Sequence, residues 1–185
     1  MKKITVAFAV MALCTTSTFV QAQAKKMQTV EVGGAPMYAS KNIVENAINS
    51  KDHTTLVAAV KAAGLVETLQ GKGPFTVFAP TNAAFEKLPA GTVDNLVKPE
   101  NKSTLTKILT YHVVAGRLDS KSLMKKLKKG NVELKTVSGD KLWIIKNEKG
   151  IWLKDEKGGM AMVTIKDVFQ SNGVIHVIDT VVMPD

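Results

Sequence analysis

The chain has 185 residues and a net charge of +9, a length typical of one domain with a substantial hydrophobic core. Its positive charge comes almost entirely from lysine, because Arg117 is the only arginine, and aromatic residues make up only 5% of the chain. Proteins that read nucleic acids rely on arginine forks and stacked aromatic side chains, so nucleic acid is not an expected partner. Acidic polysaccharides and charged cell surfaces fit this composition better.

The first 24 residues have the three regions of a secretory signal peptide. A basic start at Lys2 and Lys3 is followed by an apolar run over residues 4–13, which is too short to span a bilayer. Small residues then form a cleavage site, with cleavage after Ala22 or after Ala24 both compatible with the pattern. The protein is therefore predicted to be exported to the periplasm, the cell surface or the medium, with no transmembrane segment after cleavage.

The only cysteine, Cys14, lies within this signal peptide. Bulky Leu13 stands before it, where a lipidated cysteine normally follows a small residue, so lipidation is the less favoured alternative. The mature chain then contains no cysteine and no disulfide, and its stability must come from the hydrophobic core.

Residues 25–40 show no periodic pattern and contain Gly33, Gly34 and Pro36, which interrupt regular structure. They are predicted to form a linker, with at most one short strand at residues 29–32. The domain itself is expected to span residues 41–185.

Helical patterns dominate the first two thirds of the domain. Apolar residues recur at three- and four-residue spacing, between capping residues and glycine or proline stops, and predict these helices: 43–48, 53–63, 65–69, 82–88, 93–97, 104–110 and 120–129. A strand is predicted among them at residues 75–79, and a second begins near residue 111.

After Gly130 the pattern changes to alternating apolar and polar residues separated by turn signals. The predicted strands are 132–137, 142–146, 151–154, 160–168 and 172–183. Helices followed by a strand meander predict the α+β class.

The last strand is apolar on both faces, and each face carries one polar residue, His176 on one and Asp179 on the other. A strand of this kind lies inside a sheet that is covered on both sides. Because the two residues are three apart, they point in opposite directions and do not form a pair. Both are predicted to be buried, hydrogen-bonded structural residues.

Two surface features are candidates for binding. The helix at 120–129 carries a cluster of lysines that either contacts polyanions or simply keeps the protein soluble: Lys121, Lys125, Lys126, Lys128 and Lys129. Trp143 and Trp152 lie on adjacent strands, where they either pair across the strands or, with Met160 and Met162, cover a groove for an apolar ligand.

The sequence contains no motif typical of an enzyme or of cofactor binding, such as a nucleophile elbow, a metalloprotease helix or a phosphate-binding loop. His53 is expected to be exposed at a helix start, and His112 with His176 would make only two of the ligands that a metal requires. No cofactor and no catalytic residue are predicted.

Three blocks of sequence together resemble the fasciclin (FAS1) domain. Residues 73–85 resemble its first signature block, residues 111–116 its tyrosine–histidine block, and residues 172–184 its second signature block. The resemblance implies a β-sheet wedge or sandwich with helices gathered at one side, and a role in adhesion at cell surfaces or in extracellular matrices. It also implies an adhesion-linked role for Tyr111 and His112, which are expected to be largely buried and to hold the helix-to-strand junction.

The hypothesis from the sequence is therefore an exported, non-enzymatic module that contacts cell-surface or matrix proteins and polysaccharides. The alternative is a carrier of a small apolar molecule, such as the carotenoids bound by some members of the family.

Overall fold

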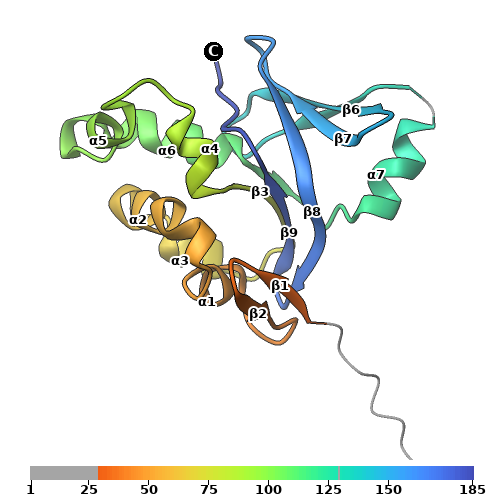
Figure 1. Cartoon of the computed structure of the whole chain (residues 1–185), viewed down its shortest axis with the longest axis horizontal. Coiled ribbons are helices and arrows are strands. Elements are labelled where there is room, and N and C mark those ends of the chain that lie inside the picture. Colours follow the sequence, from red (N-terminus) through yellow and green to blue (C-terminus); the bar gives the residue numbers. More distant parts are fainter. Residues whose placement is uncertain (1–28, 129) are drawn as a thin grey trace, which may run out of the picture.

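The computed structural model describes residues 29–128 and 130–185. The predicted signal peptide, residues 1–24, lies outside the described residues. A curled seven-stranded sheet forms the centre. Most helices gather at one side of it, and the last helix lies at the opposite side, against the strand meander (Figure 1). This is the α+β architecture that the order of helical and strand patterns predicts.

The helices lie mainly in the first two thirds of the chain, as expected. They are α1 (Ile43–Ala47), α2 (Thr54–Ala63), α3 (Val66–Gln70), α4 (Asn82–Glu86), α5 (Thr92–Leu96), α6 (Lys102–Tyr111) and α7 (Ser120–Leu127), with single 3₁₀ turns at Lys51–His53 and Pro99–Asn101. Side-chain caps are found at Thr81 for α4 and Asp119 for α7, and Gly64 ends α2 in the left-handed conformation, with φ 75°.

The sheet has the strand order β4-β3-β9-β8-β7-β6-β5, and only the β3–β9 pair is parallel. Its strands are β3 (Phe75–Pro80), β4 (Val113–Ala115), β5 (Val132–Lys135), β6 (Lys141–Asn147), β7 (Gly150–Lys154), β8 (Met160–Gln170) and β9 (Gly173–Ile178). Just beyond β5 the chain bridges back to β4, where the Val137 N–H donates to the Val113 carbonyl at 2.8 Å. The sheet thereby curls almost into a closed barrel.

The central strands β3 and β9 are covered on both faces, as predicted for the last strand. Ile175 and Val177 of β9 pack with helices α1, α2, α3 and α6 in what we call the helix-side core. Ile178 lies in the interior of the curled meander, which we call the meander core, together with Leu142 and Leu153. Alternation of side chains along two central strands thus divides most of the apolar interior into two parts.

Strand β9 is shorter than the predicted strand 172–183, because it ends at Ile178. At the next residue, the Asp179 N–H still donates to the Met162 carbonyl, but the Met162 N–H donates to the Asp179 carboxylate at 2.8 Å. A side chain has replaced the backbone acceptor there, and the ladder stops.

The short strand allowed at residues 29–32 is present, but the prediction of a linker is wrong for the rest of the hairpin that the described residues form. Strands β1 (Val30–Val32) and β2 (Ala35–Met37) form a hairpin, and Val32 and Met37 are buried in the helix-side core. Gly33 and Gly34 have φ of 59° and 72° and form the two-residue turn between the strands. Two adjacent glycines with positive φ are typical of a hairpin turn, so the feature interpreted as a breaker instead joins two strands.

Candidate functional site

Helix α7 presents a row of lysines to solvent. Leu123 is fully buried in the meander core, whereas Lys121, Lys125, Lys126 and Lys128 are exposed; Lys129 lies outside the described residues. In the described part of the chain, the ion pairs within 4.0 Å involve other lysines: Lys87 with Asp179, Lys107 with Asp140, and Lys141 with Glu133. In these described residues, no carboxylate lies within 4.0 Å of the four lysines Lys121, Lys125, Lys126 and Lys128.

The two tryptophans do not pair directly across the strands. Trp143 faces Lys154 in the ladder, and Trp152 faces Ile145 on one side and Met162 on the other. The residues share the outer face of the meander, and Met160 of the same face is 38% exposed. An open groove of about 460 Å³ adjoins Trp143 and Ile145, but its other lining residues are polar or glycine, and neither Trp152 nor the methionines line it. The structure does not bring these four residues together as an apolar pocket.

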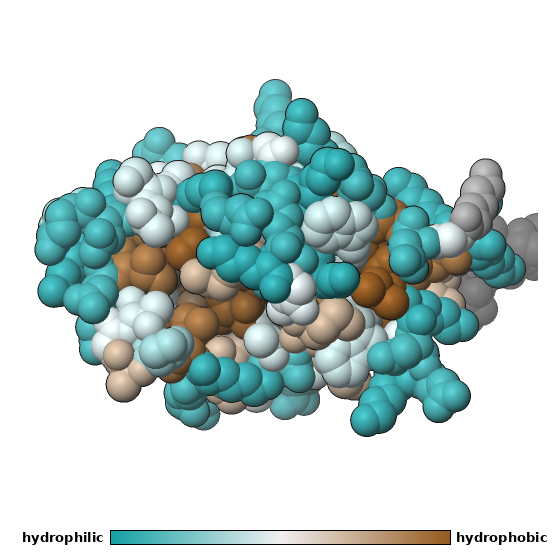
Figure 2. All heavy atoms as spheres, turned by 90° about the horizontal axis from the view of Figure 1, so that it is seen from above, coloured by the Kyte–Doolittle hydropathy of each residue, from teal (hydrophilic) through white to brown (hydrophobic). Residues whose placement is uncertain are grey.

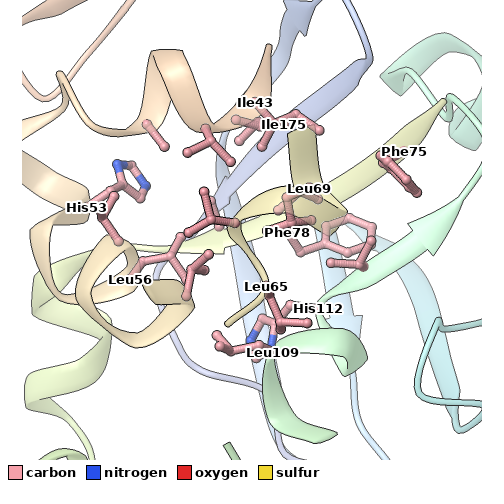
Figure 3. Close-up of a pocket in the computed structure, with 18 of the residues that line it drawn as sticks. Ile43, His53, Leu56, Leu65, Leu69, Phe75, Phe78, Leu109, His112 and Ile175 are labelled. Carbon is pink, nitrogen blue, oxygen red and sulfur yellow. The ribbon is translucent and has the colours of Figure 1, made fainter. Parts of the chain in front are cut away.

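An apolar cavity that the sequence did not reveal lies beneath helices α1, α2 and α3. It has a volume of about 80 Å³ and is lined mainly by aliphatic side chains from these helices and from β3, including Ile43, Leu56, Leu69 and Val77. Figure 3 shows the imidazoles of His53 and His112 on different sides of it. Helices are spaced by the side chains between them, so the cavity depends on packing that sequence periodicity does not specify.

His53 is buried at this cavity, which contradicts the expectation that it is exposed. It is 3% accessible, and its Nδ1 is hydrogen-bonded to the Ser50 hydroxyl at 2.9 Å. Within the described residues, its Nε2 is buried without a hydrogen-bond partner. Burial lowers the pKa of His53, so its imidazole is neutral at pH 7.

Tyr111 and His112 lie at the junction of α6 and β4 and are both buried. The Tyr111 hydroxyl donates to the Lys141 carbonyl at 2.6 Å, and burial raises its pKa. His112 Nδ1 donates to the Ile108 carbonyl at 2.8 Å, while Nε2 accepts from the Val182 N–H at 3.3 Å. This pattern requires a neutral imidazole, and burial lowers the pKa of His112 to about 4. Both side chains therefore join secondary-structure elements and are not presented to a partner.

His176 is buried in β9, where it stacks on Phe78 with ring centroids 5.7 Å apart. Its Nδ1 accepts from the Asp167 N–H at 3.4 Å, so Nε2 carries the proton that is donated to the Leu118 carbonyl at 2.8 Å. Burial lowers its pKa as well.

Asp179 differs from the prediction, because its side chain is 37% exposed. It accepts hydrogen bonds from Met162 N–H and from the Thr180 hydroxyl, and Lys87 lies 3.5 Å away. It is a strand-end residue at the surface and not a buried one.

One polar residue with a clear structural role was missed by the sequence analysis. The amide of Asn172 accepts from the Ile43 N–H at 3.0 Å and donates to the carbonyls of Leu69 and Gly71 at 2.8 and 2.9 Å. It fastens α1 and the end of α3 to the start of β9. The sequence offered only an Asn-Gly turn signal at this position, with nothing to indicate the distant partners.

Across residues 29–128 and 130–185, no three or more His, Cys, Asp and Glu side chains are grouped so that they could hold a metal ion. The helices of the same residues are all too short or too polar to cross a bilayer.

Comparison with known proteins identifies the fold. The family model described as "Fasciclin domain" matches residues 51–184. Protein sll1483 of Synechocystis is 46% identical over 164 residues, which cover 86% of this chain and 84% of the relative. The cell surface glycolipoprotein MPB83 of Mycobacterium bovis is 34% identical over 157 residues, covering 82% of this chain and 64% of the relative.

A solved structure of a FAS1 domain pair from the insect cell adhesion molecule Fasciclin I has the same fold. Its TM-score is 0.68 at 18% sequence identity, and the match covers 82% of this chain and 56% of the other. The wedge of mixed sheet with most helices at one side, the matching family model and the similar sequences agree. The chain belongs to the fasciclin domain family.

Proposed function

We propose that the protein is an exported, non-enzymatic adhesion module that contacts acidic polymers of a cell surface or extracellular matrix through helix α7. The observation that carries this proposal is the row of exposed lysines on α7, which have no carboxylate within ion-pair distance in the described residues. A partner that supplies negative charge would replace the missing carboxylates. The presence of a cell adhesion molecule and a cell surface glycolipoprotein among the similar proteins supports an extracellular role.

Cleavage of the signal peptide would remove Lys2 and Lys3, and the remaining net charge of +7 would act together with this helix. Long-range attraction increases the rate of encounter with a polyanion, and each lysine near an anionic surface contributes about 1 kcal/mol at low salt. Because salt screens exposed charges, binding of this kind must weaken as ionic strength rises.

The test is binding to immobilised polygalacturonate across a salt series. A variant with Lys121, Lys125, Lys126 and Lys128 all changed to Glu is expected to lose at least about tenfold in affinity near 0.1 M salt. A matched control changes four exposed lysines elsewhere to Glu, and it keeps the same net charge: Lys72, Lys98, Lys102 and Lys166. Equal losses in both variants, or binding that is insensitive to salt, would rule out α7 as the contact surface.

The apolar cavity supports a second candidate function, the binding of a small apolar molecule. Its aliphatic lining suits such a ligand, and the buried Nε2 of His53 offers one hydrogen-bonding position. An engineered protein cavity of about 150 Å³ holds one benzene molecule, so a space of about 80 Å³ accepts a short group. A carotenoid would fit only after helices α1 to α3 moved away from the sheet.

This second candidate is tested by the absorbance and native mass spectra of the mature protein purified from its own organism. A coloured or heavier species supports it, provided that Val60→Phe, which fills the cavity, removes the extra mass. A colourless protein with the mass of the bare chain would exclude a resident ligand.

A further inference from the structure

We infer that the open groove beside Trp143 binds a pyranose ring of a polysaccharide. The inference rests on the proposed contact with extracellular polymers and adds a site at which a sugar unit is recognised. It depends on three features of the groove: its aromatic surface, its balanced charge and its fixed wall.

The aromatic surface comes from the register of the meander. Leu142, Ile144 and Leu153 point into the meander core and are fully buried, so the residues between them must point outward. Trp143 and Ile145 are two of these outward residues, and both are half-buried and line the groove. The face of an indole carries partial negative charge and packs against the C–H groups on one face of a pyranose.

The charges around the groove balance. Lys154 and Lys157 line it together with Asp155 and Glu156, and the amide of Asn131 adds both a donor and an acceptor. A purely apolar ligand would give no partner to the ammonium groups of Lys154 and Lys157 or to the amide of Asn131, and a strongly anionic one would meet two carboxylates. A hydroxyl-rich ring satisfies donors and acceptors of both kinds, and the volume of about 460 Å³ lies within the range of small-molecule sites.

The wall of the groove is held in place before any ligand binds. The turn at residues 155–158 stands at the top of Figure 1, where β7 passes into β8. Asp155 is 4% exposed and accepts from the N–H groups of Gly159 and Met183 at 2.6 and 3.0 Å. Glu156 accepts from the Lys141 N–H at 3.1 Å. A preformed site loses less entropy when it binds its ligand.

The surroundings favour a hydrated ligand. Figure 2 looks at the molecule from above and shows hydrophilic residues with apolar areas between them. Among the residues that line the groove, Asn131, Lys154 and Lys157 are exposed. In the chain, Asn131 follows Lys128 of the α7 region by three residues. A polymer attracted by the lysines of α7 would therefore reach the groove directly.

The experiment uses the two tryptophans of the chain as reporters. Trp152→Phe leaves Trp143 as the only source of tryptophan emission, and Trp152 does not line the groove. This variant is titrated with cellohexaose, maltohexaose and N-acetylchitohexaose in 0.5 M NaCl, with glycerol as a control. We expect a saturable change in Trp143 emission with at least one oligosaccharide and none with glycerol. No response to any of the three oligosaccharides would overturn the inference.

Calorimetry with the responding oligosaccharide then locates the contact. Trp143→Ala is expected to weaken binding about tenfold or more, while Trp152→Phe binds like the original chain. Lys154 is exposed and lies opposite Trp143 in the ladder. Lys154→Ala is expected to weaken binding about threefold. It tests the same groove by a surface substitution, in case Trp143→Ala fails to fold. Unchanged affinity in both Trp143→Ala and Lys154→Ala would overturn the inference.

The same assay separates this inference from the proposed role of α7. The variant with four α7 lysines changed to Glu must keep its oligosaccharide affinity in 0.5 M NaCl if the groove is the sugar site. Lost polygalacturonate binding with retained oligosaccharide binding supports both proposals. Retained polygalacturonate binding in that variant rejects only the role of α7.

Discussion

The two cores on either side of β3 and β9 are packed differently. In the meander core, Leu142, Ile144 and Leu153 are fully inaccessible. The helix-side core contains the cavity of about 80 Å³ and the unpartnered Nε2 of His53. Strands fix their neighbours through a continuous ladder of hydrogen bonds, whereas short helices are positioned only by side chains and a few polar contacts. Of the two cores, the helix-side core is therefore the one with room for a buried apolar ligand.

The largest expected effect comes from deleting a buried leucine in each core. Leu153→Ala should reduce the free energy of unfolding by about 4–5 kcal/mol, because its tightly packed neighbours cannot collapse around the space. Leu56→Ala, in the wall of the existing cavity, should cost about 2–3 kcal/mol, since Leu56 already lacks neighbours on one side. Denaturant unfolding measures both. Equal losses would show that the two cores are equally well packed.

Acid should destabilise the protein through its three buried histidines. The pKa of His112 is about 4 in the folded chain, and those of His53 and His176 are also lowered, against about 6.5 when unfolded. At a pH between the folded and unfolded pKa values, the unfolded chain binds more protons than the folded chain. The free energy of unfolding therefore has its full value above pH 6.5 and falls as the pH drops towards 4. His112 alone accounts for about 3 kcal/mol of this loss.

Unfolding in denaturant at several pH values between 4 and 7.5 tests this dependence. The free energy of unfolding of His112→Gln is lowered at neutral pH by the substitution itself. Its further fall between pH 7.5 and pH 4 should be about 3 kcal/mol smaller than that of the original chain. An unchanged slope in that variant would show that His112 is not the main titrating group.

Asn172 is expected to hold the helix side to the sheet. Asn172→Ala removes three hydrogen bonds and leaves buried backbone groups of α1 and α3 unpaired, which should cost about 2–4 kcal/mol. Amide hydrogen exchange should increase more in α1 and α3 than in β6 and β7. Uniform exchange throughout the chain would contradict a local role.

The smallest effect, and the sharpest comparison, comes from adding one methylene group to each core. Val60→Ile extends into the cavity and should raise stability by up to about 0.8 kcal/mol. Val182→Ile, at a fully buried position of the meander core, should lower it by about 1–3 kcal/mol. Thermal melts of both variants test this difference in sign, and stabilisation by both would mean that unfilled space is not confined to the helix side.

Much of the fold follows from local patterns in the sequence. The β-branched residues of β9 predict a strand covered on both faces, and caps such as Asp119 mark where helices begin, because these signals act over a few residues. The lysines of α7 were identified in the same way, since exposed charges on a helix follow its period. Local patterns gave the wrong prediction at Gly33 and Gly34, because two adjacent glycines are compatible both with an irregular linker and with a hairpin turn.

The binding features depend on tertiary structure. The cavity arises where helices from residues 43–70 meet strands from residues 75–79 and 173–178, and no residue in any of these segments indicates its volume. His53 is polar and lies at a helix start, which locally predicts exposure, yet the packing around the cavity buries it. Asn172 contacts Ile43 across 129 residues of sequence. The sequence by itself determined the elements, the burial of His176 and His112 and the basic surface of α7, because these depend on near neighbours. Only the tertiary structure decided the cavity, the burial of His53 and the polar residues that line the groove beside Trp143, because these form where distant segments meet.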